Sequence, residues 1–182
     1  YNNLGFDRFY SIENLLNAEM MELYRTNPGK ADYLQSIAEQ YYPGENMLIM
    51  QYISDSYDYK TLIKDFESRD TSKPYFAFNV TMQNHGGYTT GCSNFNESIY
   101  VTSSENVYTK TNKYLSLVKY SDQAFEELIN YFKGVKEPTV ICMFGDHQPS
   151  VENEFIAEAL GVESLLGLSI EQEQARHITP FI

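Results

Sequence analysis

The sequence has 182 residues, which is enough for one folded domain with a hydrophobic core. Its formal net charge is -12, which argues against nucleic acid or an anionic membrane surface as the main partner. The two cysteines, Cys92 and Cys142, fit neither a disulfide framework nor a zinc ribbon. No apolar run approaches the roughly 20 residues that a membrane helix needs, and no signal peptide is visible.

Helical patterns alternate with turn signals over residues 1–70. Ser11 caps a helical pattern that runs to about residue 24, and a second pattern covers residues 31–40. Residues 47–52 form a short apolar run that fits a strand and a buried helical turn equally well. A third helix is expected over residues 57–68, after a capping run at residues 54–56. Its apolar residues recur at helical spacing: Tyr59, Leu62, Ile63 and Phe66.

Two longer apolar runs predict buried strands, with a long helix between them. Residues 74–82 and 139–144 lack polar alternation, which is typical of strands buried on both faces of a parallel sheet, and Cys142 is expected in that core. The helical pattern of residues 112–132 ends at Gly134 and completes a βαβ unit with a right-handed crossover. Its expected core stripe is Tyr114, Leu115, Val118, Phe125, Leu128, Ile129 and Phe132.

The last part of the chain predicts two short helices. The first covers residues 152–160, and the second starts at Ser169, with Gln172 at capping-box spacing. Together these patterns indicate the α/β class, with a largely parallel sheet flanked by helices in a single unit over residues 1–182.

Each predicted core strand ends in a polar loop that carries a histidine. His85 follows residues 74–82, while Asp146 and His147 follow residues 139–144. In open α/β sheets, ligands bind beyond the carboxyl ends of the strands. A carboxylate beside an imidazole suits a divalent cation such as manganese or zinc, and His85 could bind an anionic oxygen or pass a proton. The alternative is structural: a capping aspartate and two loop histidines.

Two segments resemble signature segments of lipoteichoic acid synthases and related phosphoglycerol transferases, which are sulfatase-like members of the alkaline phosphatase superfamily. They are Thr-Met-Gln-Asn-His-Gly-Gly-Tyr at residues 81–88 and Phe-Gly-Asp-His-Gln-Pro at residues 144–149. Residues 4–10, 114–122 and 176–182 are similar to further segments of the family in the same order. The resemblance therefore extends over nearly the whole chain.

The resemblance implies an alkaline-phosphatase-like fold and a two-step transfer of glycerophosphate from phosphatidylglycerol to a cell-envelope polymer or glycolipid. A threonine of the family attacks the phosphodiester. Asp146 and His147 would be two ligands of one divalent ion, manganese first, with zinc, magnesium and calcium as alternatives. The ion would activate the nucleophile and balance phosphoryl charge. His85 would be the catalytic-site residue that contacts the phosphate or the glycerol of the substrate.

The resemblance also implies a location and a limit. Such enzymes stand on the extracellular face of a bacterial cell membrane, held by amino-terminal helices. Their nucleophile and a further acidic ligand lie upstream of the segments matched here. We therefore expect residues 1–182 to be a fragment of the catalytic domain, inactive alone and with weak or no metal binding, because two protein ligands rarely suffice.

Three other functions remain open from the sequence. The first is a sulfuric-ester hydrolase, which needs a Cys or Ser in a Cys-x-Pro-x-Arg-like context that neither Cys92 nor Cys142 has. The second is a non-catalytic sulfatase-like binding module. The third is an unrelated α/β domain with two incidental histidines.

Overall fold

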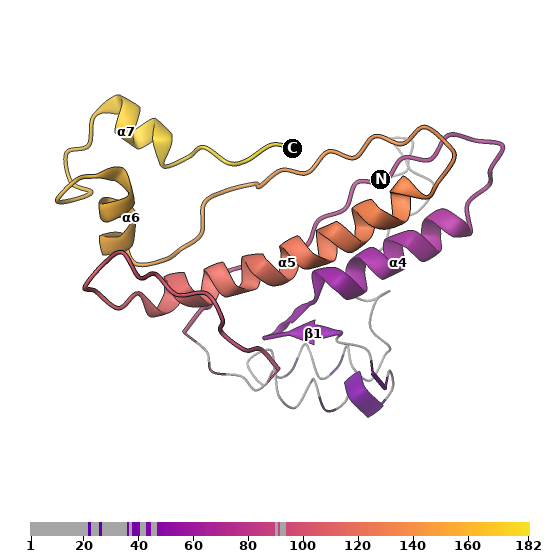
Figure 1. Cartoon of the computed structure of the whole chain (residues 1–182), viewed down its shortest axis with the longest axis horizontal. Helices are drawn as coiled ribbons and strands as arrows, with labels where there is room; N and C mark the ends of the chain where they lie inside the picture. Colours follow the sequence, from indigo (N-terminus) through magenta and orange to yellow (C-terminus); the bar gives the residue numbers. More distant parts are fainter. Residues whose placement is uncertain are drawn as a thin grey trace.

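The computed structural model describes residues 22, 26, 36, 38–40, 43–44, 47–89, 91 and 94–182. Most of the helix expected from Ser11 and most of the pattern over residues 31–40 lie outside these residues, as does Cys92. The elements, shown in Figure 1, are β1 (Leu48–Ile49), β2 (Tyr52–Ile53), α4 (Asp55–Glu67), α5 (Thr109–Lys133), α6 (Asn153–Leu160) and α7 (Ile170–Ala175). No helix in this part of the chain is both long enough and apolar enough to span a bilayer.

The apolar run at residues 47–52 forms a β-hairpin, which decides between the two alternatives left by its sequence. β1 and β2 are antiparallel, with Ile49 opposite Tyr52. Met50 in the turn has a φ of 53°, a conformation that non-glycine residues adopt only with support from their surroundings. Asn94 supplies that support: its Oδ1 accepts from the Met50 N–H at 3.1 Å, and its Nδ2 donates to the Met50 carbonyl at 3.1 Å.

Helices α4 and α5 run side by side and form the main contact between helices in the described part of the chain (Figure 1). Both were predicted from the sequence, α4 to within two residues at its start. Ser54 caps α4 by accepting a hydrogen bond from the Tyr57 N–H, and Gly134 ends α5. The buried face of α5 is centred on Leu117, Ala124 and Leu128. Of the expected apolar stripe only Leu128 is buried; the others are half-buried on its flanks.

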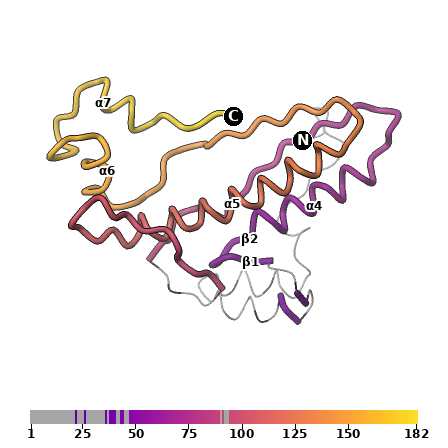
Figure 2. The backbone as a smooth tube through the Cα atoms, in the orientation of Figure 1, coloured from indigo at the N-terminus to yellow at the C-terminus, as the bar shows by residue number. Residues whose placement is uncertain are grey.

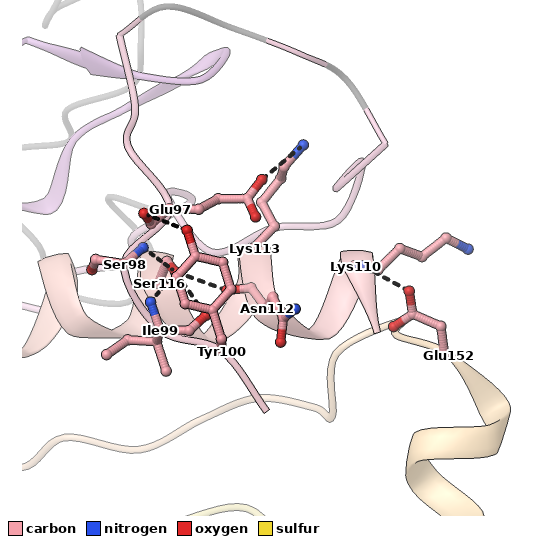
Figure 3. A network of polar contacts seen from close by, with 9 residues as sticks. All are labelled: Glu97, Ser98, Ile99, Tyr100, Lys110, Asn112, Lys113, Ser116 and Glu152. Atoms are coloured by element: carbon pink, nitrogen blue, oxygen red, sulfur yellow. Dashed lines mark hydrogen bonds and ion pairs between the residues drawn. The ribbon is translucent and has the colours of Figure 1, made fainter. Parts of the chain in front are cut away.

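Polar side chains on α5 bind a series of loops, as Figure 3 shows for its first half. Ser116 Oγ accepts from the backbone N–H groups of Ser98 and Ile99, both at 3.0 Å. Asn112 Oδ1 accepts from the Val101 N–H at 2.8 Å. Because Ser116 and Asn112 are buried, these bonds satisfy polar groups that would otherwise be costly to remove from water. The helix therefore serves as a polar anchor for loops as well as a packing surface.

The two expected core strands differ from the prediction. Residues 74–82 and 139–143 are extended, but they do not pair with each other; the sheet formed by the described residues is the antiparallel hairpin β1–β2. Phe76 is 71% exposed and Val140 is 89% exposed. Cys142, expected in the core, is an exposed free thiol. A strand is buried on both faces only between flanking strands and covering helices, and the described residues provide neither on both sides of these segments.

The carboxyl-terminal segment returns to the segment that precedes Asp146. α6 and α7 were both predicted, and the capping box of Ser169 and Gln172 is confirmed. The backbone then runs back along residues 139–145 (Figure 2). Met143 and Ile182 exchange two backbone hydrogen bonds, at 2.9 and 2.8 Å. This pairing is antiparallel. Among the described residues, it is the β-type pairing found for residues 139–145.

Candidate active site

The loop that carries His85 is held to α4 and α5 by the buried side chain of Gln83. Gln83 Oε1 accepts from the Asp55 N–H at 3.0 Å, and Gln83 Nε2 donates to Ser121 Oγ at 2.9 Å and to the Leu117 carbonyl at 3.3 Å. Gln83 is only 1% exposed, and these three hydrogen bonds give both polar atoms of its buried amide group protein partners. The position of the loop is thereby fixed two residues before His85.

Asp55 adds an ionisable group to this anchor. Burial raises the pKa of its carboxyl, although hydrogen bonds from the side chains of Ser121 and Thr81 and from the backbone of Gln83 oppose the rise. Asp55 lies at the first turn of α4, where a negative charge is favourable next to the helix N-terminus. The start of α4, the middle of α5 and the end of the segment 74–82 are thus joined in one polar network.

Tyr52, on β2, contacts His85 directly. The Tyr52 hydroxyl lies 3.0 Å from His85 Nδ1 and 3.4 Å from the Gly86 carbonyl oxygen. The two rings meet edge to face, with centroids 5.5 Å apart. His85 itself is exposed. The hairpin therefore carries the hydroxyl that orients the imidazole.

The two glycines after His85 have different roles. Gly87 has a φ of +112°, and a Cβ there would lie 3.3 Å from Gln51 Nε2. Gly86 has no heavy atom within 4 Å of the corresponding position. Tyr88, which follows them, is 3% exposed, and its hydroxyl donates to the Asn84 carbonyl at 2.7 Å. Burial is the main cause that raises the pKa of Tyr88 to about 12, so this hydroxyl remains a donor at neutral pH.

Asp146 and His147 lie together in an exposed loop after residues 139–144. The Asp146 and His147 side chains are 83% and 66% exposed, and Asp146 Oδ2 is 3.6 Å from His147 Nε2. His147 Nδ1 lies 2.9 Å from the Gln148 carbonyl oxygen. A carbonyl oxygen can only accept, so Nδ1 carries a proton, and in the neutral ring Nε2 is the nitrogen left to bind a metal.

This donor pair fits a divalent ion. Two ligand atoms that each lie about 2.1 Å from one ion are about 3.0 Å apart in octahedral coordination and about 3.4 Å apart in tetrahedral coordination. The observed separation of 3.6 Å is slightly longer than both values and is also an ordinary distance for an acid–histidine pair. The bond from Nδ1 to a backbone carbonyl is also the support that metal-bound histidines normally have. The donor types of Asp146 and His147, and the support of His147 Nδ1, therefore suit this pair to serve as two ligands of a divalent ion.

The expected site residues are not gathered into one cluster. In the part of the chain that the structure describes, no group of three or more His, Cys, Asp or Glu side chains is arranged to hold a metal. His85 contacts Tyr52, whereas Asp146 and His147 contact each other and Gln148. A surface hollow lined by Ile170, Glu173, Gln174 and His177 contains none of the expected residues. Convergence of the two loops stays a prediction.

Sequence reasoning missed Tyr52 and Gln83. Gln83 lies within the segment 81–88, two residues before His85, so the sequence could have indicated that it supports the histidine loop. Tyr52 is 33 residues away in the sequence from His85, and a tyrosine in a short apolar run is an ordinary core residue. No local pattern could have linked the two.

Comparison with known proteins gives a family. The family described as Sulfatase matches the chain over residues 1–182. An uncharacterized protein of Haemophilus influenzae is 31% identical over 85 residues, which are 46% of this chain and 15% of that protein. The matched stretch is thus a small part of the length of that relative. No solved structure matches the chain.

Proposed function

Because the chain belongs to the sulfatase family, whose members are enzymes of the alkaline phosphatase superfamily, we propose that the protein is a metal-dependent phosphoglycerol transferase. Its substrate would be the glycerophosphate head group of a phosphatidylglycerol-type lipid, or another phosphodiester. Its place would be the extracellular face of a bacterial membrane. Support for this choice within the family comes from the segments at residues 81–88 and 144–149.

One observation carries the metal-dependent chemistry. Asp146 Oδ2 and His147 Nε2 lie 3.6 Å apart, and His147 Nδ1 is hydrogen-bonded to the Gln148 carbonyl oxygen, so Oδ2 and Nε2 are the two atoms that could bind one ion. A divalent ion bound there would supply Lewis-acid stabilisation of phosphoryl charge. Manganese is the proposed ion. A further acidic ligand would have to come from outside the described residues, since two ligands leave the ion weakly held.

The complete domain would contain the largely parallel sheet that the described residues lack. The segments 74–82 and 139–144 would be two of its strands, with His85, Asp146 and His147 beyond their carboxyl ends. Support comes from the apolar side chains that these segments expose: Phe76, Phe78, Val80, Val140 and Phe144. Further strands would bury these side chains, and the removal of their apolar surface from water would stabilise the domain.

The proposal is tested with Asp146→Asn and His147→Asn in the whole protein, assayed for glycerophosphate release from phosphatidylglycerol vesicles with Mn²⁺. Loss of a metal ligand should lower the rate by at least about 100-fold. The matched control is Glu173→Gln. Glu173 Oε1 lies 3.9 Å from His177 Nε2, so it is a second exposed acid–histidine pair outside the proposed site. Unchanged activity in both ligand variants would contradict the proposal.

Sulfuric-ester hydrolysis is the second candidate, because the matching family is described as Sulfatase. The two activities are separated by giving the whole protein an aryl sulfate and a phosphatidylglycerol lipid in parallel. The proposal requires turnover of the lipid to exceed turnover of the sulfate ester. The reverse preference would make the protein a sulfatase with the same metal ligands.

A further inference from the structure

We propose that Ser121, on α5, is a positioning residue for His85. Its hydroxyl holds the two side chains that directly precede the imidazole, those of Gln83 and Asn84, and so sets the place of the His85 loop, residues 82–88. The inference rests on the proposed function for the reaction that His85 serves. The contacts that link Ser121 to the loop are properties of this chain alone.

Two side-chain amides meet at the Ser121 hydroxyl. Gln83 Nε2 and Asn84 Nδ2 each donate to Ser121 Oγ at 2.9 Å. The orientation of the Gln83 amide is fixed independently, because its Oε1 accepts from the Asp55 N–H and its Nε2 also donates to the Leu117 carbonyl. Ser121 gives its own proton to the Asp55 carboxyl. The hydroxyl thus uses its donor and both acceptor positions, although Ser121 is only 4% exposed.

The backbone between these two side chains and the imidazole is tightly folded. The His85 N–H donates to the Met82 carbonyl at 2.9 Å, which closes a turn around the two anchored residues. The hydroxyl of the buried Tyr88 donates to the Asn84 carbonyl at 2.7 Å and closes the loop on its other side. A shift of residues 83 and 84 would therefore move His85 with them. Ser121 acts on the imidazole through these neighbours.

A second buried serine of α5 provides a matched comparison. Ser116 also accepts two N–H groups from a loop, the backbone groups of Ser98 and Ile99, both at 3.0 Å. That loop contains none of the proposed site residues. Loss of either serine hydroxyl leaves donors without their partner, so both alanine variants should be less stable than the unaltered protein. Only the loss of the Ser121 hydroxyl should disturb His85.

The kinetic test is a double-mutant cycle in the whole protein, with glycerophosphate release from phosphatidylglycerol vesicles in Mn²⁺ as the assay. Ser121→Ala should lower kcat/KM by about tenfold or more, because a small misplacement of a reacting group is costly. In a His85→Gln background the same substitution should have no further effect, because a positioning residue acts through the group that it positions. Ser116→Ala should leave kcat/KM unchanged, and Ser121→Thr, which keeps the hydroxyl, should restore most of the rate.

NMR of the imidazole C–H groups in the whole protein gives a reading that needs no turnover, with His85→Gln to assign the signal. We expect the His85 Cε1–H signal to shift or broaden in Ser121→Ala and to stay unchanged in Ser116→Ala. Ser121→Cys, which has nearly the same volume but a weak hydrogen-bonding group, takes the place of Ser121→Ala if the alanine variant does not fold.

Two results would overturn the inference. One is an unchanged His85 signal after loss of the Ser121 hydroxyl. The other is a loss of kcat/KM that is equally large with and without His85, which would mean that Ser121 acts on the protein in general. If the His85 signal moves but no lipid is turned over, the proposed function fails and the positioning role of Ser121 stands.

Discussion

Backbone conformation at single residues decides how the His85 loop can be built. Gly87 adopts a φ of +112°, which side chains disfavour, and its missing Cβ makes room for the Gln51 amide. Gly86 meets neither condition. The motif reads Gly-Gly, but only the second glycine is required by the geometry.

Gly87→Ala should therefore lower the free energy of unfolding by about 1–2 kcal/mol, the strain of an L-residue at positive φ. Gly86→Ala, its matched control, should leave stability unchanged or raise it by up to about 1 kcal/mol, because alanine restricts the unfolded chain. Urea unfolding of both variants measures the difference. Equal destabilisation by the two substitutions would show that the loop has a different conformation.

At this scale the sequence identified His85, Asp146 and His147 as candidates, because each follows an apolar run that ends abruptly. It could not find Tyr52, because the contact with His85 depends on the fold of a hairpin far away in the sequence. The pairing of Asp146 with His147 was accessible, because neighbouring residues in a turn stay close whatever surrounds them.

Among the elements, α5 is fixed at its start by a carboxylate from another segment. Glu152 accepts from the Lys110 N–H at 2.7 Å, the Thr111 N–H at 2.9 Å and the Thr111 hydroxyl at 2.8 Å. It thus satisfies backbone donors that the first turn of a helix leaves free. Burial alone would raise the pKa of Glu152, but these hydrogen bonds outweigh it and hold the pKa below its usual value.

Glu152→Gln should destabilise the protein by about 1 kcal/mol at neutral pH, because it removes a charge that favours the helix N-terminus. A carboxyl with a lowered pKa in the folded state stabilises above its unfolded pKa, and this contribution is lost as the pH falls through the folded value. The difference between the two proteins should therefore be full above about pH 4.5 and shrink below it.

Thermal unfolding at several pH values measures this difference. Glu126→Gln, on an exposed part of α5, is the control and should show no such pH dependence. A gap between Glu152→Gln and the unaltered protein that stays constant down to pH 3 would contradict the capping role.

The helices were predictable because their signals are local: Ser54 and Ser169 as caps, Gly134 as a terminator, and apolar spacing within one segment. The polar anchors on α5 were not, since Ser116 binds residues that lie 17 and 18 positions away. Residues 74–82 and 139–144 were predicted as buried strands of a parallel sheet, but among the described residues they do not pair with each other and many of their apolar side chains are exposed. Their burial depends on neighbours that no pattern within residues 74–82 or 139–144 contains.

On the scale of the whole molecule, the central claim is that the His85 loop and the Asp146–His147 loop face one site. The sequence suggested this from the order of strand, helix and strand. The structure fixes each loop separately: the first through Gln83 and Tyr52, the second through the pairing of residues 143–145 with 180–182. The parallel sheet proposed above would bring the two loops together at one edge.

Paramagnetic broadening by Mn²⁺ tests this claim most directly. The whole protein, labelled with ¹⁵N at its imidazole nitrogens, is titrated with Mn²⁺, and Asp146→Asn is titrated alongside as the control. We predict that bound Mn²⁺ broadens the His85 signals strongly in the unaltered protein and has no such effect in Asp146→Asn. Sharp His85 signals in a protein that binds Mn²⁺ through Asp146 would place the imidazole away from the ion and contradict a shared site.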